Sequence, residues 1–158
     1  MRLTVYTDYS LRVLMFLAVR GGELATIAEI AKAYGISKNH LMKVVHQLGL
    51  AGYVETVRGK GGGLRLARPP RDIVLGELVR CTEPDMTLVP CFDPADVSCA
   101  IFSGCLLRGV LANARDAFLT VLDRHTLADL VRPRASLQKV LAFKPNARAA
   151  VRRPGRQA

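Results

Sequence analysis

The residues most able to do chemistry are cysteines that lie close together in the middle of the chain. Cys91, Cys99 and Cys105 are separated by seven and five residues, and the prolines, glycine and serine around them indicate a loop. Three thiolates on one loop suit a soft metal or an iron–sulfur cluster, which usually needs a fourth ligand. No C-x-x-C pair occurs, which argues against a zinc knuckle or ribbon. The residues alone predict a metal or redox site and leave its metal open.

Cys81 is the fourth cysteine of the chain, but its surroundings favour another interpretation. A short helix leading to it is predicted by the apolar residues Ile73, Leu75, Leu78 and Val79. On such a helix we expect Cys81 to be a small buried residue rather than a ligand. Three thiols that bind nothing remain the alternative to any metal site.

The charge of the chain predicts an anionic partner. The 158 residues include 23 Lys and Arg against 13 Asp and Glu, a net charge of +10. The surplus is +6 in residues 1–80 and +5 in residues 143–158, while residues 81–142 carry −1. A basic block of this kind is typical of proteins that bind nucleic acid.

Composition excludes two other classes of protein. Half of the residues are hydrophobic, which is ample for a folded core and argues against a disordered chain. No apolar run approaches the length of about 18 residues that a membrane span requires, so we expect no membrane association. Asp8 lies where a signal peptide would be apolar. We therefore expect a cytoplasmic protein without structural disulfides.

Three helices are predicted in the first fifty residues. The first is expected to be capped by Asp8, whose carboxylate can accept from free backbone N–H groups. The second starts with Thr26 and Glu29 at the spacing of a capping box. Gly35 ends the second helix, and Ser37 is expected to cap the third.

The second and third helices match a helix-turn-helix, whose second helix enters the major groove of DNA. Lys can donate to guanine, and Asn can pair with adenine. The candidate DNA-binding residues at the start of the third helix are Ser37, Lys38, Asn39, His40 and Lys43. An ordinary solvated helix face with surface lysines is the alternative for this segment alone.

A basic hairpin follows and favours DNA binding. Residues 53–57 and 63–67 predict two strands, with Arg58 and Lys60 in the glycine-rich loop between them. Such a wing can lie along phosphates or reach the minor groove, so both residues are candidate DNA contacts. A nucleotide-binding loop would need the pattern G-x-x-x-x-G-K-[ST], which is absent.

Residues 107–131 predict one long helix with a heptad-like apolar seam. The seam consists of Leu107, Leu111, Ala114, Phe118 and Val121. A second apolar row, Leu106, Val110, Ala117 and Leu122, broadens this face. A small winged helix cannot cover so much apolar surface, so we expect a homodimer that binds a palindromic operator in double-stranded DNA. A helix packed inside its own chain is the alternative.

The expected fold is therefore mainly α with a small two-stranded β-wing. It comprises a winged-helix domain at residues 1–80, a cysteine loop at 81–106, a dimerisation helix at 107–131 and a basic, disordered tail at 132–158. The tail either adds non-specific attraction to DNA or aids solubility.

Several stretches together resemble one family. They are TDYSLRVL at residues 7–14, GISKNHL at 35–41, ETVRGKGGGLRLA at 55–67, and FL with TLADL at 118–119 and 126–130. Through them the chain resembles the small bacterial winged-helix repressors that carry a three-cysteine iron–sulfur loop, and specifically their nitric-oxide-sensing group. The resemblance covers residues 1–131 and presents the DNA-binding, cysteine and dimer segments in the same order.

This resemblance implies an iron–sulfur cluster, [4Fe–4S] in preference to [2Fe–2S], held by Cys91, Cys99 and Cys105. It further implies that Asp8 of the partner subunit is the fourth ligand, and that nitric oxide attacks the cluster and releases target genes. Arg108 stands where the group that regulates iron–sulfur biogenesis has a histidine, which favours the nitric-oxide-sensing group. The seven-residue gap between Cys91 and Cys99 is longer than the family pattern.

Three other functions compete with this interpretation. One is a related iron–sulfur or iron-status regulator, and another is a zinc-stapled DNA-binding protein without a sensing role. The third is a redox enzyme or electron carrier that uses the same cysteines. The sequence contains no dinucleotide fingerprint and no paired catalytic acid and base, so we do not expect an enzyme.

Overall fold

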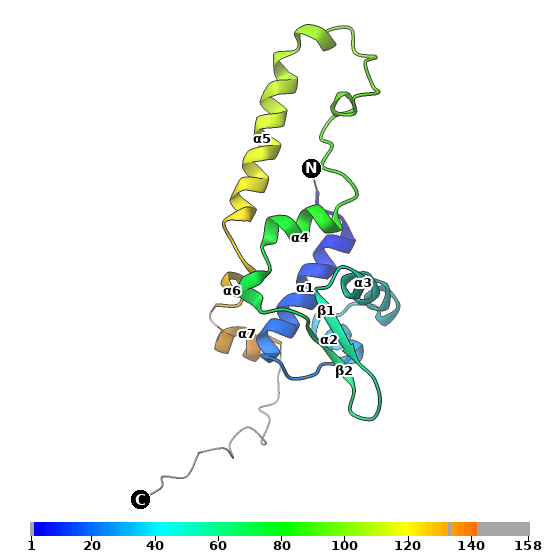
Figure 1. Ribbon diagram of the computed structural model, residues 1–158, viewed down its shortest axis with the longest axis vertical. Coiled ribbons are helices and arrows are strands. Elements are labelled where there is room, and N and C mark those ends of the chain that lie inside the picture. Colours follow the sequence, from blue (N-terminus) through cyan, green and yellow to red (C-terminus); the bar gives the residue numbers. More distant parts are fainter. Residues whose placement is uncertain (1, 133, 142–158) are drawn as a thin grey trace, which may run out of the picture.

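The computed structural model describes residues 2–132 and 134–141 (Figure 1). Its α-helices are α1 (Val5–Arg20), α2 (Ile27–Tyr34), α3 (Lys38–Leu50), α4 (Leu75–Thr82), α5 (Leu106–Asp123), α6 (Leu127–Leu130) and α7 (Arg134–Val140). The strands are β1 (Val54–Val57) and β2 (Gly63–Leu66), and the 3-10 turns are η1 (Pro70–Asp72), η2 (Pro90–Phe92) and η3 (Phe102–Gly104). The expected mainly α fold with a two-stranded wing is confirmed. Within the described ranges, no helix combines the length and apolar character needed to cross a bilayer.

Helix α1 lies at the centre of the core. Its residues Val13, Leu14, Phe16 and Leu17 are at most 2% exposed. Helices α2, α3, α4, α6 and α7 and strand β2 all contact it. Other members of the same apolar cluster come from the elements around α1: Ile30, Leu41, Val45, Leu48, Ile73, Leu78 and Leu127.

The helix-turn-helix is built by local backbone chemistry. The predicted capping box of α2 is present, because the Thr26 hydroxyl accepts from the Glu29 N–H at 3.2 Å and Glu29 accepts from the Thr26 N–H at 2.7 Å. Burial tends to raise the pKa of Glu29, but the bonds from Thr26 and the charge of Arg20 hold it below its ordinary value. Gly35 ends α2 in the left-handed region, with φ +66°.

The wing is an antiparallel pair that runs from Val54 opposite Leu66 to Val57 opposite Gly63. The Arg65 guanidinium donates two hydrogen bonds of 3.0 Å to the Glu55 carboxylate across the strands. Leu64 also exchanges two backbone hydrogen bonds with Ala25, of 2.7 and 3.0 Å. The wing is thus attached to the segment that precedes the helix-turn-helix (Figure 1).

Helix α4 joins α1 to the long helix α5. The Thr7 hydroxyl of α1 donates to the Thr82 hydroxyl at 2.9 Å, and both residues are buried. On its other side, the Arg80 guanidinium of α4 donates two hydrogen bonds of 2.7 Å to Asp123 at the end of α5. A Cβ at Gly76 would lie 1.8 Å from an Asp123 oxygen, so the glycine leaves room for this ion pair. The bonds from Arg80 hold the pKa of Asp123 below its ordinary value.

The predicted cap of the first helix is wrong. The N-cap is Thr4, whose hydroxyl accepts from the Thr7 N–H at 3.2 Å, and Asp8 lies inside the first turn of α1. The reason is a contact distant in sequence, because the Glu83 carboxylate accepts from the backbone N–H of Thr4 at 2.8 Å and from its hydroxyl at 3.2 Å. The helix therefore starts earlier than the local pattern suggested.

The single helix predicted over residues 107–131 is also wrong, because the structure divides it into α5 and α6. Thr126 begins α6 with a capping box to Asp129, and it pairs with Val74 in an isolated β-bridge. The predicted disordered tail begins too early, since α7 lies within residues 132–158 and its Arg134 donates to the Val19 carbonyl at 2.8 Å. The rest of that expectation, at residues 142–158, lies outside the described residues.

Truncation of the core of α1 tests this arrangement. We expect Leu14→Ala to lower the free energy of unfolding by about 2–5 kcal/mol, because Leu14 is fully buried among several elements. The matched control is Leu50→Ala at the end of α3, where the side chain is 72% exposed and the expected change is within about 0.5 kcal/mol. Urea unfolding followed by circular dichroism measures both, and equal losses would contradict the placement of α1 at the centre.

Candidate DNA-binding and metal sites

Helix α3 presents one exposed polar face beside a buried apolar one. Leu41, Val44, Val45 and Leu48 are at most 6% exposed and attach the helix to the core. The predicted contact residues Ser37, Lys38, Asn39, His40 and Lys43 are all exposed. Ser37 occupies the N-cap position but makes no capping hydrogen bond, so its predicted cap interaction is wrong.

The same face of α3 holds further residues that the sequence interpretation missed. Met42, His46 and Gln47 are exposed and follow Asn39 and Lys43 at steps of three and four residues. Continuing the helical period along the polar face would have found them. The exposed face therefore extends over about two turns, which is enough to follow several base pairs in a major groove.

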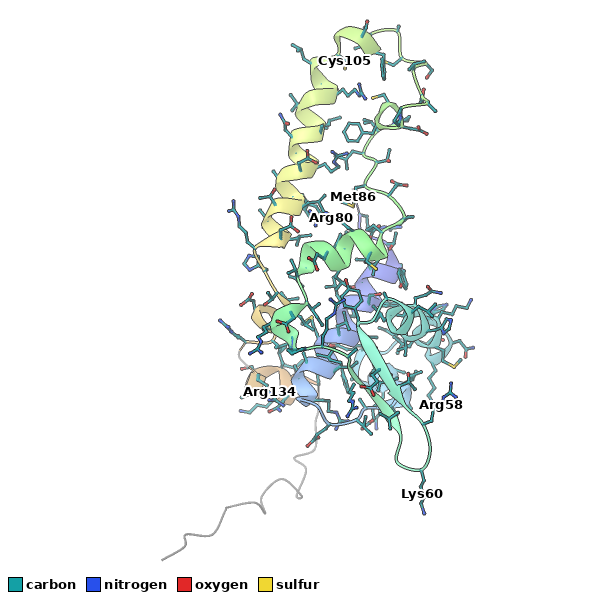
Figure 2. All side chains as sticks on the ribbon, in the orientation of Figure 1. Arg58, Lys60, Arg80, Met86, Cys105 and Arg134 are labelled. Atoms are coloured by element: carbon teal, nitrogen blue, oxygen red, sulfur yellow. The ribbon has the colours of Figure 1, made fainter. Side chains whose placement is uncertain are left out.

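The wing carries its two candidate residues at the loop between β1 and β2. Arg58 and Lys60 are exposed, and Lys60 extends from the end of the hairpin (Figure 2). Gly59 and Gly61 lie at φ +98° and +80°, a backbone region that favours glycine. Arg65 differs from these cations, because it is paired with Glu55 on the same wing. Arg58 and Lys60 form no ion pair with any residue the structure describes.

The cysteine loop, residues 83–105, connects α4 to α5 at the opposite end of the molecule from the wing (Figure 2). Cys91 lies in η2, Cys99 precedes η3, and Cys105 is at the N-cap position of α5. All three are free thiols; Cys99 is exposed and the other two are half-buried.

The structure does not bring the predicted ligands together. Among the described residues, no group of three or more His, Cys, Asp or Glu side chains is arranged to hold a metal ion. The chemistry of the donor set nevertheless fits a cluster, because three thiols without disulfide partners follow one another along a single loop. Cys105 also lines a cavity of 520 Å³ between this loop and α5.

The loop is shaped by its own acidic residues. Asp93 accepts from the Ala95 N–H at 2.9 Å, and Asp96 accepts from the Ser98 N–H at 3.1 Å and from its hydroxyl at 2.6 Å. The Ser98 bonds hold the pKa of Asp96 below its ordinary value. Both carboxylates are therefore engaged in local turns within the segment that contains Cys91 and Cys99.

Asp8, the expected ligand of the partner subunit, lies on the exposed side of α1. Its carboxylate pairs with Arg12 one turn later, at 2.9 Å, and its side chain is 46% exposed. The Arg12 guanidinium in turn lies 5.9 Å from the centre of the Tyr34 ring of α2. Tyr9, the next residue of α1, contacts the His40 ring of α3 with 6.4 Å between ring centres.

Cys81 does not occupy the place expected for it. The predicted short helix is present as α4, but the Cys81 thiol is exposed on its surface instead of buried. The buried positions of α4 are Leu75, Gly76, Leu78, Val79 and Thr82. Cys81 lies on the opposite, exposed side of the helix.

A helix-turn-helix followed by a basic two-stranded wing defines a winged-helix DNA-binding protein. The chain belongs to the Rrf2 family of iron-dependent transcriptional regulators, whose family model matches residues 3–133.

Curated relatives of the chain are transcriptional regulators and not enzymes, and the same holds for this protein. It is 55% identical over 145 residues to the HTH-type transcriptional regulator NsrR of Bacillus subtilis, covering 91% of this chain and 99% of that one. NsrR of Bacillus licheniformis is 50% identical, over 90% of this chain and 100% of its own. The resemblance noted from the sequence is confirmed by these NsrR relatives.

Solved structures agree with the fold. The structure of T. potens IscR matches with a TM-score of 0.68 and 26% identity, covering 87% of this chain and 91% of that one. The match extends well beyond the helix-turn-helix and the wing. The winged-helix fold expected from the sequence is thereby confirmed.

Substitutions in the wing and in α3, which we call the reading helix, should impair DNA binding in different ways. We expect Arg58→Ala and Lys60→Ala each to weaken binding to any DNA duplex and to reduce the salt dependence of the affinity by about one unit of slope. We expect Asn39→Ala to cost about 1–3 kcal/mol on the preferred site and far less on random duplex. Fluorescence anisotropy at several salt concentrations measures both effects.

Arg132→Ala is the matched control, because Arg132 is an exposed arginine just after α6 that pairs with Asp129 of that helix and belongs to neither α3 nor the wing. The Arg132→Ala protein should keep the DNA affinity of the unchanged protein and the same salt dependence of that affinity. A loss of preference for the operator in the wing variants, with an unchanged salt slope, would contradict the role assigned to Arg58 and Lys60.

Proposed function

We propose that this chain is a nitric-oxide-responsive repressor whose DNA binding depends on an iron–sulfur cluster, and that it binds a palindromic operator as a homodimer. The observation that carries the proposal is the set of three free thiols on the loop between α4 and α5. Their number and softness suit a cluster, and the family is described as iron-dependent. The proposed ligands are Cys91, Cys99 and Cys105, and the proposed cluster is [4Fe–4S] in preference to [2Fe–2S].

Asp8 of the partner subunit is the proposed fourth ligand. Within its own chain the Asp8 carboxylate pairs with Arg12 at 2.9 Å, and both side chains are more than 40% exposed. An exposed ion pair of this kind contributes only about 0–1 kcal/mol, so Asp8 can leave Arg12 at little cost. A carboxylate is a harder ligand than a thiolate and leaves its iron open to a small molecule. A bound cluster would supply the iron that nitric oxide recognises.

The position of Asp8 also suggests how ligation reaches the DNA. Arg12 lies over Tyr34 of α2, and Tyr9 contacts His40 of α3. When Asp8 exchanges Arg12 for another partner, Arg12, which lies over Tyr34 of α2, loses its ion-pair partner. We infer that occupation of the fourth ligand position shifts α3 between two arrangements, of which one fits the major groove.

The homodimer is supported by the surface of α5. No residue of this 18-residue helix is buried in the chain. One face carries Leu107, Val110 and Val121, which are 61%, 62% and 53% exposed, together with the exposed Ala114 and Ala117. These residues recur at steps of three and four, so they form one continuous apolar row. A second copy of the helix would cover the row and place two reading helices on one operator.

Two alternatives use the same residues and are distinguished by metal content and signal. An iron-status regulator would carry a cluster but would respond to iron supply instead of nitric oxide. A zinc-stapled DNA-binding protein would contain stoichiometric zinc, lack iron and keep its DNA affinity when nitric oxide is added. Arg108, in place of a histidine, weighs against the first alternative, and the absence of a C-x-x-C pair weighs against the second.

The decisive experiment is an anaerobic titration of the purified protein with nitric oxide. We expect a visible chromophore to bleach as affinity for the operator falls, because the same event changes the cluster and the reading helix. Absorbance and operator binding are followed in one sample, with iron and zinc contents measured beforehand. A colourless protein that binds DNA with and without nitric oxide would overturn the proposal.

Single substitutions sharpen this titration. We expect Cys91→Ser, Cys99→Ser and Cys105→Ser to abolish the chromophore, whereas Cys81→Ser is the matched control and should retain it. Asp8→Ala should leave the fold intact, because Asp8 is not the cap of α1, but alter cluster stability or the nitric-oxide response. Unchanged spectra and response would remove Asp8 from the ligand set.

A charge in the apolar row of α5 tests the homodimer. We expect Val110→Glu to produce a monomer with weakened operator binding, because two carboxylates would be buried in the interface. Thr120→Glu is the matched control, since Thr120 is exposed on a different face of α5. Sedimentation equilibrium measures the mass of each, and a dimeric Val110→Glu protein would place the interface elsewhere.

A further inference from the structure

Two arginines of α5 lie on the rings of two phenylalanines in the cysteine loop. The Arg108 guanidinium lies 4.6 Å from the centre of the Phe102 ring, and that of Arg115 lies 5.2 Å from the Phe92 ring. All four side chains are half-buried, in contrast to most of their neighbours on the loop. Both distances are within the range in which an aromatic ring attracts a cation.

The two pairs hold the segments that carry the thiols. Phe92 follows Cys91 directly in η2, and Phe102 begins η3, three residues before Cys105. Arg108 and Arg115 are seven residues apart, so they lie on the same face of α5, two turns from each other. Each 3-10 turn of the loop is therefore attached to the helix by its own pair.

A cavity lies between the two attachments. Its volume is 520 Å³, and its lining includes both arginines, both phenylalanines and Cys105. The helix surface between the arginines contributes only Gly109 and Ala112, which leaves the space open. The cavity thus exists because long side chains at its two ends bridge the loop and the helix while small residues separate them.

The two arginines differ in charge balance. Arg115 is paired with Asp116 through bonds of 2.9 and 2.8 Å, so its charge is largely compensated. Arg108 forms no ion pair with any residue in the described ranges, and the loop carboxylates of Asp93 and Asp96 accept hydrogen bonds within their own turns. Arg108 therefore adds an uncompensated positive charge to the lining of the cavity.

We propose that Arg108 and Arg115 are positioning residues that hold the turns η2 and η3 against α5 and keep the cavity beside Cys105 formed before any cluster binds. We call these two arginine–phenylalanine contacts the clasp. Arg108 has a second role, because its free cation lines the same cavity as Cys105 and would attract the negative charge of a cluster held by that thiolate. The first role is independent of a bound group, whereas the second rests on the proposed iron–sulfur function.

The metal-free protein tests the clasp directly. We expect Arg108→Met to speed hydrogen exchange of residues 99–104 and alkylation of Cys105 about two- to fivefold, the effect of losing one partly exposed cation–π contact. Arg115→Met should do the same for residues 90–93 and Cys91. Methionine keeps an apolar stem of similar length, so simple loss of packing is limited.

Further variants complete the test. Arg108→Lys keeps the cation and should restore protection in large part. In a double-mutant cycle, Arg108→Met combined with Phe102→Leu should be no worse than either change alone, because the two residues act as one contact. Arg124→Met is the matched control, since Arg124 is an exposed arginine beyond the far end of α5, and it should behave as the unchanged protein.

The iron-loaded protein separates the two roles. Loss of the free cation in Arg108→Met should shift the midpoint potential of the cluster to more negative values, because reduction adds negative charge. Arg108→Lys should largely preserve that potential. Wild-type exchange and alkylation rates in both Met variants would overturn the clasp, whether or not a cluster binds. Altered rates in a protein that binds no iron would leave the clasp intact and refute the cluster instead.

Discussion

The described structure depends on the burial of one helix, α1, by almost every other element. Its apolar residues are in contact with the helix-turn-helix, the wing and α4, so a change at one of these parts is transmitted to the others through packed side chains. At its first turn, the buried Thr7 and Thr82 hydroxyls and the Thr4 and Glu83 pair attach α1 to the start of the cysteine loop. The start of the cysteine loop and helix α3 are thereby both attached to the first turns of α1.

Helix α5 has the opposite character, because it leaves the core and carries no buried residue. Its three faces differ in character. The face with Arg108 and Arg115 contacts the loop, the face with Val110 is apolar and exposed, and the third face is polar. In proteins most of the stability of a helix comes from tertiary packing and less from intrinsic propensity. The ion pair of Arg80 with Asp123 and the contacts to the loop attach it to the chain, while its apolar row remains for a partner.

Local patterns predicted several features correctly where neighbours in sequence decide the geometry, although the cap expected from Ser37 does not form. The capping box of Thr26, the break at Gly35 and the basic hairpin all follow from residues within a few positions of one another. The same reasoning failed at Asp8, because Thr4 is selected as cap by Glu83 from the far side of the chain. It failed again at Thr126, where a bridge to Val74 and a local capping box start a new helix.

The sequence by itself therefore determined the class of fold, the reading helix with its wing, and the three thiols on one loop. Each of these depends on residue types and short spacings, which act through backbone conformation and local hydrogen bonds. Only the tertiary structure decided that Cys81 is exposed, that α5 keeps an uncovered apolar row, and that Arg108 meets Phe102. These features depend on how separate elements pack, and packing is set by contacts between residues that no local pattern brings together.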